Sequence, residues 1–264
     1  QFIIDENSFN KRSIYPFTQL QDTINEPLLL TYKNDYTVLS NVCTHRGSIL
    51  CDNISFETKI KCPYHGRLFT TYGRVINAPG FDKKNIEKDN LKNYKVKNWN
   101  SFLFCSLTGG INIDDVLLDI NSRLVNYPFN DLQYDSKRSQ TYQVDVHWAL
   151  YCENYLEGFH IPFVHKGLKN DINLNSYKTI LLENGVLQYT LSKENEKNNY
   201  LNNTYAYYYW IFPNIMLNFY SWGLSMNIIE PIKKNKTRIR FLSFPIKGMT
   251  PPDSTPSSLD IVEK

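Results

Sequence analysis

Short apolar or β-branched runs, separated by turn residues, fill the first 110 residues of the chain. Residues 28–32 and 36–42 are two such runs, and the polar tripeptide between them is typical of a hairpin turn. A third run at 102–107 ends in a Gly-Gly pair, whereas the charged stretch 87–94 is predicted to be a surface loop. This part of the chain is therefore predicted to be a small antiparallel β domain.

The pattern changes in the second half. Residues 111–138 carry no continuous strand or helix pattern and predict a connector with one short helix near 114–124. Between 147 and 160 apolar residues recur at helical spacing, which predicts a second helix. Four later runs, several of them alternating, predict an antiparallel sheet; they are residues 186–191, 215–220, 225–229 and 237–244. The predicted fold class is α+β.

The chain stops where another helix is expected to begin. Residues 251–256 are rich in proline and predict a loop, and Ser257 with Asp260 three positions later approximates a capping box. We therefore expect that the second domain is truncated at its C-terminus, Lys264. The first residue is Gln1 rather than Met, which is compatible with a processed or truncated start.

Composition narrows the class of protein. The 264 residues are 42% hydrophobic and 21% charged, as in a soluble globular protein of one or two domains. The net charge of +3 does not favour nucleic acid or a membrane surface as a partner. The apolar runs are far shorter than the ~20 residues of a membrane-spanning helix, and no secretory signal is visible. Five cysteines, an odd number, favour a reducing cytoplasmic location and metal ligation over disulfides.

Two segments each present one cysteine and one histidine. Cys43 and His45 lie in Cys-Thr-His-Arg-Gly, and Cys62 and His65 lie in Cys-Pro-Tyr-His-Gly. Two thiolates for one iron and two imidazoles for the other suit a [2Fe–2S] cluster with mixed ligands. The alternatives are a zinc site, although that usually has paired cysteines followed by paired histidines, and a set of buried residues without metal.

A second group of candidate ligands follows in the predicted helix. Glu157 and His160 are three residues apart, so a continuous helix would place them on one face. Pro162 is expected to end or distort that helix, which lets His165 turn back towards His160. Two imidazoles and a carboxylate form the facial triad that holds oxygen-activating ferrous iron. Taken alone, this His-x4-His spacing more often marks two structural histidines.

Other polar and aromatic residues have milder interpretations. Cys51, Cys105 and Cys152 are predicted to be small buried hydrophobic residues, and His147 is predicted to be structural at the start of the helix. The run 205–210 holds four tyrosines and a tryptophan, which is typical of sheet surface and core. Its sharper alternative is an aromatic cage for a quaternary ammonium group, bound by cation–π contact.

Together these motifs resemble those of the Rieske non-haem iron oxygenases. The two Cys/His loops are similar to the Rieske domain of that family, and less similar to respiratory Rieske proteins, whose loops each carry an extra cysteine. Arg67 departs from the pattern, because Trp commonly follows the second His-Gly of the family. Residues 154–168 and 212–222 resemble the choline monooxygenases and related quaternary-amine oxygenases most.

The resemblance implies a domain organisation and a set of roles. Residues 1–112 would form the Rieske domain, 113–138 a connector, and 139–264 a catalytic domain of helix-grip-like antiparallel sheet with helices. The implied ligands are Cys43, His45, Cys62 and His65 for a [2Fe–2S] cluster, and His160 and His165 for a mononuclear non-haem Fe(II). Glu157 would be the catalytic bridge from a neighbouring subunit's cluster. The third iron ligand is expected beyond Lys264, with Asp260 as the candidate within the chain.

The implied function is that of an oxygenase component. It would use O2 and electrons from a flavin/iron–sulfur reductase to hydroxylate or N-dealkylate a small organic substrate, such as choline, betaine or carnitine. The alternatives are an aromatic-ring-hydroxylating dioxygenase alpha subunit and a Rieske electron carrier whose second domain is inactive. A homotrimer, or a multiple of it, is also implied, because each cluster would serve the iron of a neighbouring subunit.

Overall fold

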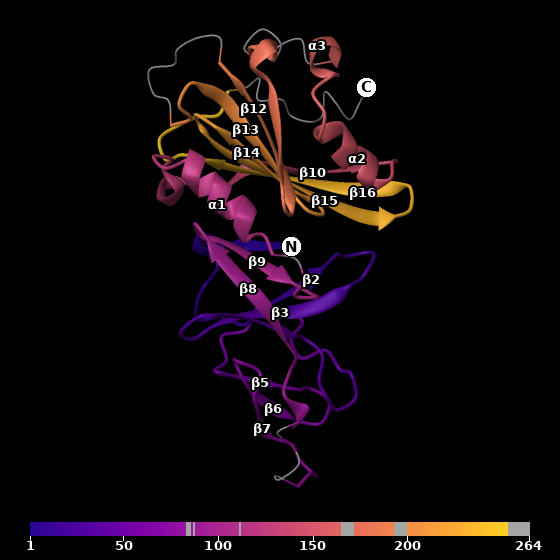
Figure 1. Ribbon diagram of the computed structural model, residues 1–264. Helices are drawn as coiled ribbons and strands as arrows, with labels where there is room; N and C mark the ends of the chain where they lie inside the picture. The colour runs from indigo at the N-terminus through magenta and orange to yellow at the C-terminus, as the bar shows by residue number, and fades with distance from the viewer. Residues whose placement is uncertain (83–85, 87, 111, 165–171, 193–199, 253–264) are drawn as a thin grey trace. The chain divides into compact units, whose positions relative to one another are not determined.

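The computed structural model describes residues 1–82, 86, 88–110, 112–164, 172–192 and 200–252 (Figure 1). The chain divides into two compact units, Gln1–Ile111 and Asn112–Lys264. Antiparallel sheets dominate both units, and the few helices belong mainly to the second. The α+β class predicted from the sequence is confirmed. None of the helices within the described residues has the length and apolar character needed to cross a membrane.

The described residues of the first unit form two sheets. The six-stranded sheet has the order β1-β9-β8-β4-β3-β2. Its strands are β1 (Phe2–Asp5), β2 (Tyr15–Gln19), β3 (Glu26–Tyr32), β4 (Tyr36–Ser40), β8 (Asn93–Trp99) and β9 (Phe102–Ser106). The smaller sheet has the order β5-β6-β7, with β5 (Lys59–Lys61), β6 (Leu68–Thr70) and β7 (Val75–Asn77). The predicted hairpin is β3 and β4, paired up to Tyr32 and Tyr36.

Strand β3 separates two cores, which explains why its sequence is apolar without alternation. Leu28 and Leu30 belong to a core with Val38, whereas Leu29 points to a second core. Successive side chains of a strand point to opposite faces, so a strand covered on both sides needs apolar residues throughout. The second core also contains Cys43 and Cys62, so the candidate ligand loops are anchored on this hydrophobic cluster.

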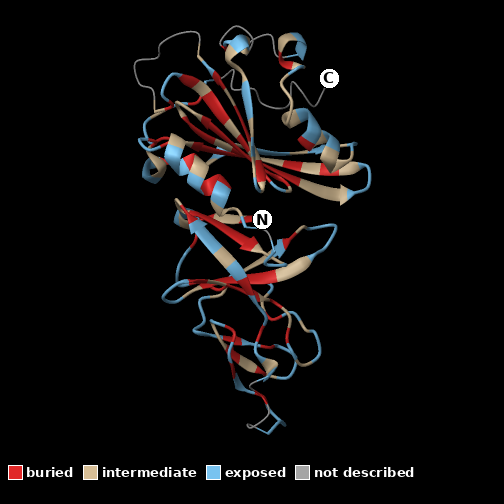
Figure 2. Cartoon of the chain, viewed as in Figure 1, coloured by how far each residue is buried: buried red, intermediate tan, exposed pale blue. Residues whose placement is uncertain are grey.

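The second unit is built on one antiparallel sheet of seven strands, in the order β10-β16-β15-β14-β13-β12-β11. The strands are β10 (Asp135–Val144), β11 (Lys178–Leu182), β12 (Gly185–Leu191), β13 (Thr204–Ile211), β14 (Ile215–Tyr220), β15 (Gly223–Lys233) and β16 (Lys236–Pro245). Buried residues concentrate on its central strands (Figure 2), and five of the six residues of β14 are buried. All four strands predicted from the later apolar runs are present.

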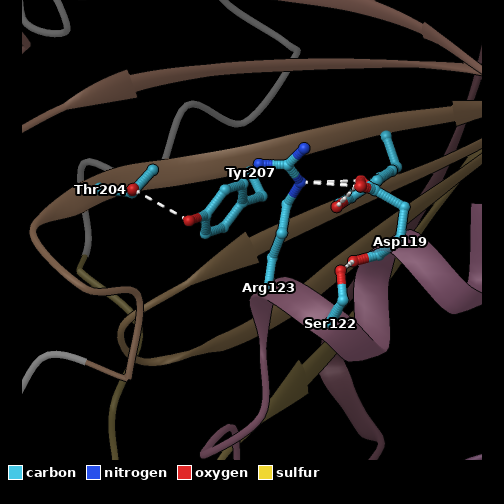
Figure 3. Close-up of polar contacts among 6 residues, drawn as sticks. Asp119, Ser122, Arg123, Thr204 and Tyr207 are labelled. Atoms are coloured by element: carbon cyan, nitrogen blue, oxygen red, sulfur yellow. Dashed lines mark hydrogen bonds and ion pairs between the residues drawn. The ribbon is translucent and has the colours of Figure 1, made fainter.

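Helix α1 (Asp114–Arg123), which matches the short helix predicted in the connector, packs on one face of this sheet. Its carboxylate Asp119 accepts two hydrogen bonds from Arg123 Nε, at 2.7 and 2.8 Å (Figure 3). Asp119 also accepts a hydrogen bond from the Tyr209 hydroxyl of β13 at 3.2 Å. The Arg123 guanidinium also lies 5.5 Å from the ring centroid of Tyr189 in β12. These contacts join α1 to the sheet.

Helix α2 (Trp148–Tyr155) packs on the opposite face. Its Cys152 lies in a core cluster with Met216, Ile229 and Trp210 of the sheet. Trp210 follows Tyr209 in β13, and neighbouring residues of a strand point to opposite faces. Glu157 and His160 come directly after α2, so they lie beyond the helix end on this face.

Candidate functional site

The two Cys/His loops have the same backbone geometry. In one, the Gly47 N–H donates to the Cys43 carbonyl at 3.0 Å, and in the other the Gly66 N–H donates to the Cys62 carbonyl at 3.1 Å. In each loop the cysteine N–H donates at 2.8 Å to the carbonyl five residues later. Both glycines have a φ of 72°, which glycine adopts more readily than other residues. The sequence motifs thus encode a repeated turn.

The four predicted ligands are brought together by these turns. The rings of His45 and His65 have their centroids 4.8 Å apart. Cys43 and Cys62 are 3% and 2% exposed and their thiols interact with each other, whereas His65 is exposed and His45 half-buried. The site therefore has a buried thiol end and an imidazole end at the surface.

Backbone donors help to hold the Cys62 sulfur in the charged form that binds metal, whereas burial raises the pKa of its neighbour Cys43. Burial alone would raise the pKa of Cys62, but N–H groups of His65 and Tyr64 bond its sulfur and lower the pKa. At His45, partial desolvation and the charges of His65 and Arg67 lower the pKa, which favours the neutral imidazole. A thiolate and a neutral imidazole are the metal-binding forms of these side chains.

The donor set fits a [2Fe–2S] cluster of the Rieske type. Among the described residues, no three histidine, cysteine or acidic side chains surround one point as ligands of a single ion would. A Rieske cluster takes only two protein ligands at each iron, so it does not need such a triplet. The thiol pair would hold the inner iron and the imidazole pair the outer one.

The second group of candidate ligands is placed differently from the prediction. Helix α2 ends at Tyr155, and a new short helix, α3, begins at Ile161 (Ile161–Val164). Glu157 and His160 therefore lie in the turn between helices and not on one helical face, and Pro162 lies in the first turn of α3, where proline is tolerated. The predicted continuous helix to His160 is wrong, because backbone N–H groups of the turn bond the Glu157 carboxylate instead of helical carbonyls.

Glu157 is the residue that organises this turn. Its carboxylate accepts hydrogen bonds from the N–H groups of Phe159 and His160, and it bonds Nδ1 of the His160 ring. Burial would raise the pKa of Glu157, but these bonds outweigh burial and lower it. With Nδ1 held by a carboxylate, Nε2 is the atom of His160 that would bind a metal, as in many metal-bound histidines.

The turn is attached to the sheet by two residues far from it in sequence. Gln188 of β12 is 1% exposed, donates to the Tyr155 carbonyl at 2.7 Å and accepts from the Tyr177 hydroxyl at 2.6 Å. The Tyr177 ring lies against Gly158, where an added Cβ would come within 2.8 Å of it. Sequence patterns did not single out Gln188 or Tyr177, because their role depends on strand pairing.

The residues of the predicted aromatic cage do not all lie on one face of the sheet. Tyr209 bonds α1 and Tyr207 pairs with Tyr189, so these two lie on the face opposite to α2. The aromatic residues on the α2 face form a row of neighbours: Tyr155, Tyr208, Tyr220 and Trp222. Tyr205 interacts electrostatically with Tyr208 and Tyr220, and it lies where the register between β12 and β13 shifts. A shift of one residue moves a side chain to the other face.

This aromatic row is ordered by ring packing and by hydrogen bonds of the Tyr155 hydroxyl. The Tyr208 and Tyr220 rings are 6.0 Å apart and perpendicular, and Trp222 stacks on Tyr220 at 5.1 Å. The Tyr155 hydroxyl donates to Asn218 Oδ1 at 2.8 Å. Burial raises the pKa of Tyr155, Tyr208 and Tyr220. The hydroxyls therefore stay neutral, so a cation would be attracted by the ring faces and not by a phenolate charge.

The remaining predicted residues have simpler outcomes. His147 is the N-cap of α2 and accepts from the Ala149 N–H at 3.3 Å, so the structural interpretation is confirmed. Cys105 and Cys152 are buried as predicted, whereas Cys51 is only half-buried. His165 and Asp260 lie outside the described residues.

Comparison with known families supports both metal centres. The family described as "Rieske [2Fe-2S] domain" matches residues 12–99, and "Ring hydroxylating alpha subunit (catalytic domain)" matches residues 131–255. Chloroplastic choline monooxygenase of Arabidopsis thaliana is 27% identical over 222 residues, which cover 76% of this chain and 51% of that protein. The chain thus spans about half the length of the curated relatives it matches.

Solved structures share the fold at low identity. The quaternary ammonium Rieske monooxygenase CntA in complex with L-carnitine has a TM-score of 0.67 and 20% identity, over 96% of this chain and 69% of that one. Naphthalene 1,2-dioxygenase with indole bound has a TM-score of 0.68 and 13% identity, over 99% and 69%. With a Rieske domain followed by a ring-hydroxylating catalytic domain, the chain belongs to the alpha subunits of the Rieske non-haem iron oxygenases.

Proposed function

We propose that this chain is the oxygenase component of a system that hydroxylates or N-dealkylates a small quaternary amine, such as choline, betaine or carnitine. It would use O2 and electrons from a flavin/iron–sulfur reductase, and would act as a homotrimer or a multiple of it. The [2Fe–2S] cluster supplies electrons and a mononuclear Fe(II) activates O2 when both are bound. The proposed ligands are Cys43, His45, Cys62 and His65 for the cluster, and His160 and His165 for the Fe(II).

The observation that carries this proposal is the bond between Glu157 and Nδ1 of His160. A carboxylate in that place fixes the tautomer and the orientation of a histidine that binds metal through Nε2. An electron carrier needs only the first metal centre and has no use for such a pair. Glu157 is also the proposed bridge to a neighbouring subunit, which it would serve by holding a proton and a charge beside His160.

The aromatic row on the α2 face supports a quaternary amine as substrate. Tyr155 ends the helix from which Glu157 and His160 follow, and Tyr208 and Tyr220 are its neighbours. Aromatic faces attract a quaternary ammonium group, which cannot donate hydrogen bonds. A ring-hydroxylating dioxygenase remains the second candidate, since rings of this kind also pack against an aromatic substrate.

Metal titration separates an oxygenase from a carrier. Fe(II) is added under argon to the full-length protein with its cluster already assembled, and bound iron is measured after gel filtration. The proposal expects one further iron per chain, lost in His160→Ala, while the cluster absorption stays constant. A chain that binds no further iron, or binds it equally in His160→Ala, supports the carrier. Asp260→Asn tests the candidate third ligand within the chain, and an unchanged Fe(II) affinity would exclude it.

Ligand titration tests the substrate class without requiring turnover. Choline is compared by calorimetry with 3,3-dimethyl-1-butanol, which has the same shape with carbon in place of the charged nitrogen. We expect choline, betaine or carnitine to bind and the neutral analogue to bind about 10-fold more weakly. Tyr220→Leu should remove this preference and Tyr220→Phe should keep it, with Tyr189→Leu on the other face as control. Tighter binding of indole or naphthalene than of any amine favours the dioxygenase.

A further inference from the structure

Arg67 is a buried charge beside the cluster loops. Among the described residues it is the one buried lysine or arginine, with 2% of its surface exposed. It follows Gly66 directly, and its carbonyl accepts from the N–H of the ligand Cys62 at 2.8 Å. Burying a guanidinium is costly unless it is paired and hydrogen-bonded, so its partners determine what this charge can do.

The partners of Arg67 lie on the other ligand loop and on the segment after β7. Its Nη1 donates to Asp89 Oδ2 at 2.9 Å and to Thr44 Oγ1 at 3.0 Å. Thr44 stands between the ligands Cys43 and His45, and its hydroxyl donates to the Asp89 carbonyl at 2.7 Å. Arg67 of the second loop is therefore tied directly to the first.

A ring contact extends the connection to a ligand. The Arg67 guanidinium carbon lies 5.1 Å from the ring centroid of Phe81, and this ring meets His45 edge-on with centroids 5.1 Å apart. A cation over an aromatic face is attracted by it, so Phe81 is held between Arg67 and His45. The arginine thus contacts Thr44 directly and reaches His45 through Phe81.

The charge of Arg67 is incompletely neutralised. Its side chain is 3% exposed, whereas that of its partner Asp89 is 34% exposed. Water screens the more exposed charge better, so the positive field dominates on the buried side. Arg67 acts electrostatically on both Cys43 and His45. One-electron reduction adds a negative charge to a cluster, and a nearby cation stabilises the reduced form.

We propose that Arg67 is a positioning residue that raises the reduction potential of the Rieske cluster, by fixing a positive charge between the two ligand loops. The potential, and not the presence of the cluster, is the property that this charge sets.

The test is a redox titration of the cluster, followed by its absorption, in variants that separate charge from shape. Arg67→Met removes the charge, and the ratio of reduced to oxidised cluster at a fixed potential should fall about tenfold, which is about 59 mV for one electron. Arg67→Lys keeps the charge and loses the planar fork, so its ratio should stay within about threefold of wild type. Arg74→Met, which removes an exposed arginine from the turn between β6 and β7, is the control and should shift little.

The direction in which Asp89→Asn changes the reduction potential separates an electrostatic role of Arg67 from a structural one. This substitution removes the negative partner and keeps Arg67, so the ratio of reduced to oxidised cluster should rise. A merely structural role predicts that Asp89→Asn and Arg67→Met change the potential in the same direction, because both break the same ion pair. The proposal is overturned by that result, or by an Arg67→Lys shift as large as that of Arg67→Met. If Arg67→Met assembles no cluster, the other two variants decide. An unchanged potential in Arg67→Lys together with a raised potential in Asp89→Asn supports the proposal. Any other pair of results refutes it.

Discussion

The two proposed metal centres differ in how far apart in the sequence the residues lie that form and support them. At the cluster loops, each Cys/His pair lies within four residues, and the turn that presents it is closed within the motif. At Glu157 and His160, the turn is held by Gln188 and Tyr177, which come from β12 and the segment before β11. The first centre is thus formed by local turns on a hydrophobic core, and the second depends on tertiary support.

This difference teaches where each centre is vulnerable. Loss of one ligand should abolish the cluster, because four side chains share two irons and none is redundant. Single substitutions around the second centre should each lower metal binding only partly. Several contacts support the turn, and each contributes only part of the orientation of Glu157 and His160. The following predictions test this contrast, beginning with the largest effect.

Cys43→Ser should eliminate the cluster, since a hydroxyl at this position does not replace the thiolate that holds the iron. We expect the iron–sulfur absorption per chain to fall to background. Cys105→Ser is the matched control, because Cys105 is equally buried at 3% but lies in β9, away from the loops. Full absorption in Cys43→Ser would remove Cys43 from the ligand set.

Glu157→Ala should weaken the second centre without touching the first. It removes the partner of His160 Nδ1 and the acceptor for two backbone N–H groups, so Fe(II) affinity should fall about 10–100-fold while cluster absorption is unchanged. Glu157→Gln keeps an acceptor and loses the charge. We expect Glu157→Gln to bind Fe(II) nearly as well as wild type but to turn over at least about tenfold more slowly. Wild-type turnover in this variant would exclude the proposed bridge.

Gly158→Ala probes the tertiary support directly. The added methyl would meet the Tyr177 ring at 2.8 Å, and overpacking of this kind costs about 1–3 kcal/mol of unfolding free energy. The double variant Gly158→Ala/Tyr177→Leu should lose less than the sum of the two single changes, because the shorter side chain makes room. Denaturant unfolding measures all four proteins, and strict additivity would mean that the ring does not press on this turn.

The smallest effect is expected at His147, the N-cap of α2. His147→Ala leaves the Ala149 N–H without its side-chain acceptor, and loss of an N-cap costs about 0.5–2 kcal/mol of stability. His147→Asn should restore most of that stability, and neither variant should change the iron content. Loss of iron in His147→Ala would place this histidine among the ligands.

Much of the fold could be predicted from the sequence, and the exceptions have physical causes. The β3–β4 hairpin, α1 and β14 follow from apolar periodicity and turn residues, which are local signals. The helix predicted to reach His160 instead ends at Tyr155. Apolar spacing reports which side chains are buried, but it does not report that Glu157 captures backbone N–H groups or that Gly158 lies beneath a distant tyrosine ring.

The candidate sites divide in the same way. The cluster ligands could be predicted because spacing and chemistry are written in two short motifs. The cage could not, because Tyr207 and Tyr208 are neighbours in sequence but point to opposite faces of β13. Tyr220 and Trp222 of the aromatic row come from the end of β14 and the turn after it. Strand pairing brings Tyr220 to Tyr208, and Trp222 stacks on Tyr220.

The sequence by itself determined the turns that present Cys43, His45, Cys62 and His65, since each is closed by a glycine and a backbone bond within the same segment. It also determined the α+β class, because strand and helix periods are properties of consecutive residues. Only the tertiary structure decided that Arg67 is buried against Thr44 and Asp89, and that Gln188 supports the turn of Glu157. Contacts between distant segments depend on which strands pair and in which register, and a one-residue shift in register moves a side chain to the other face.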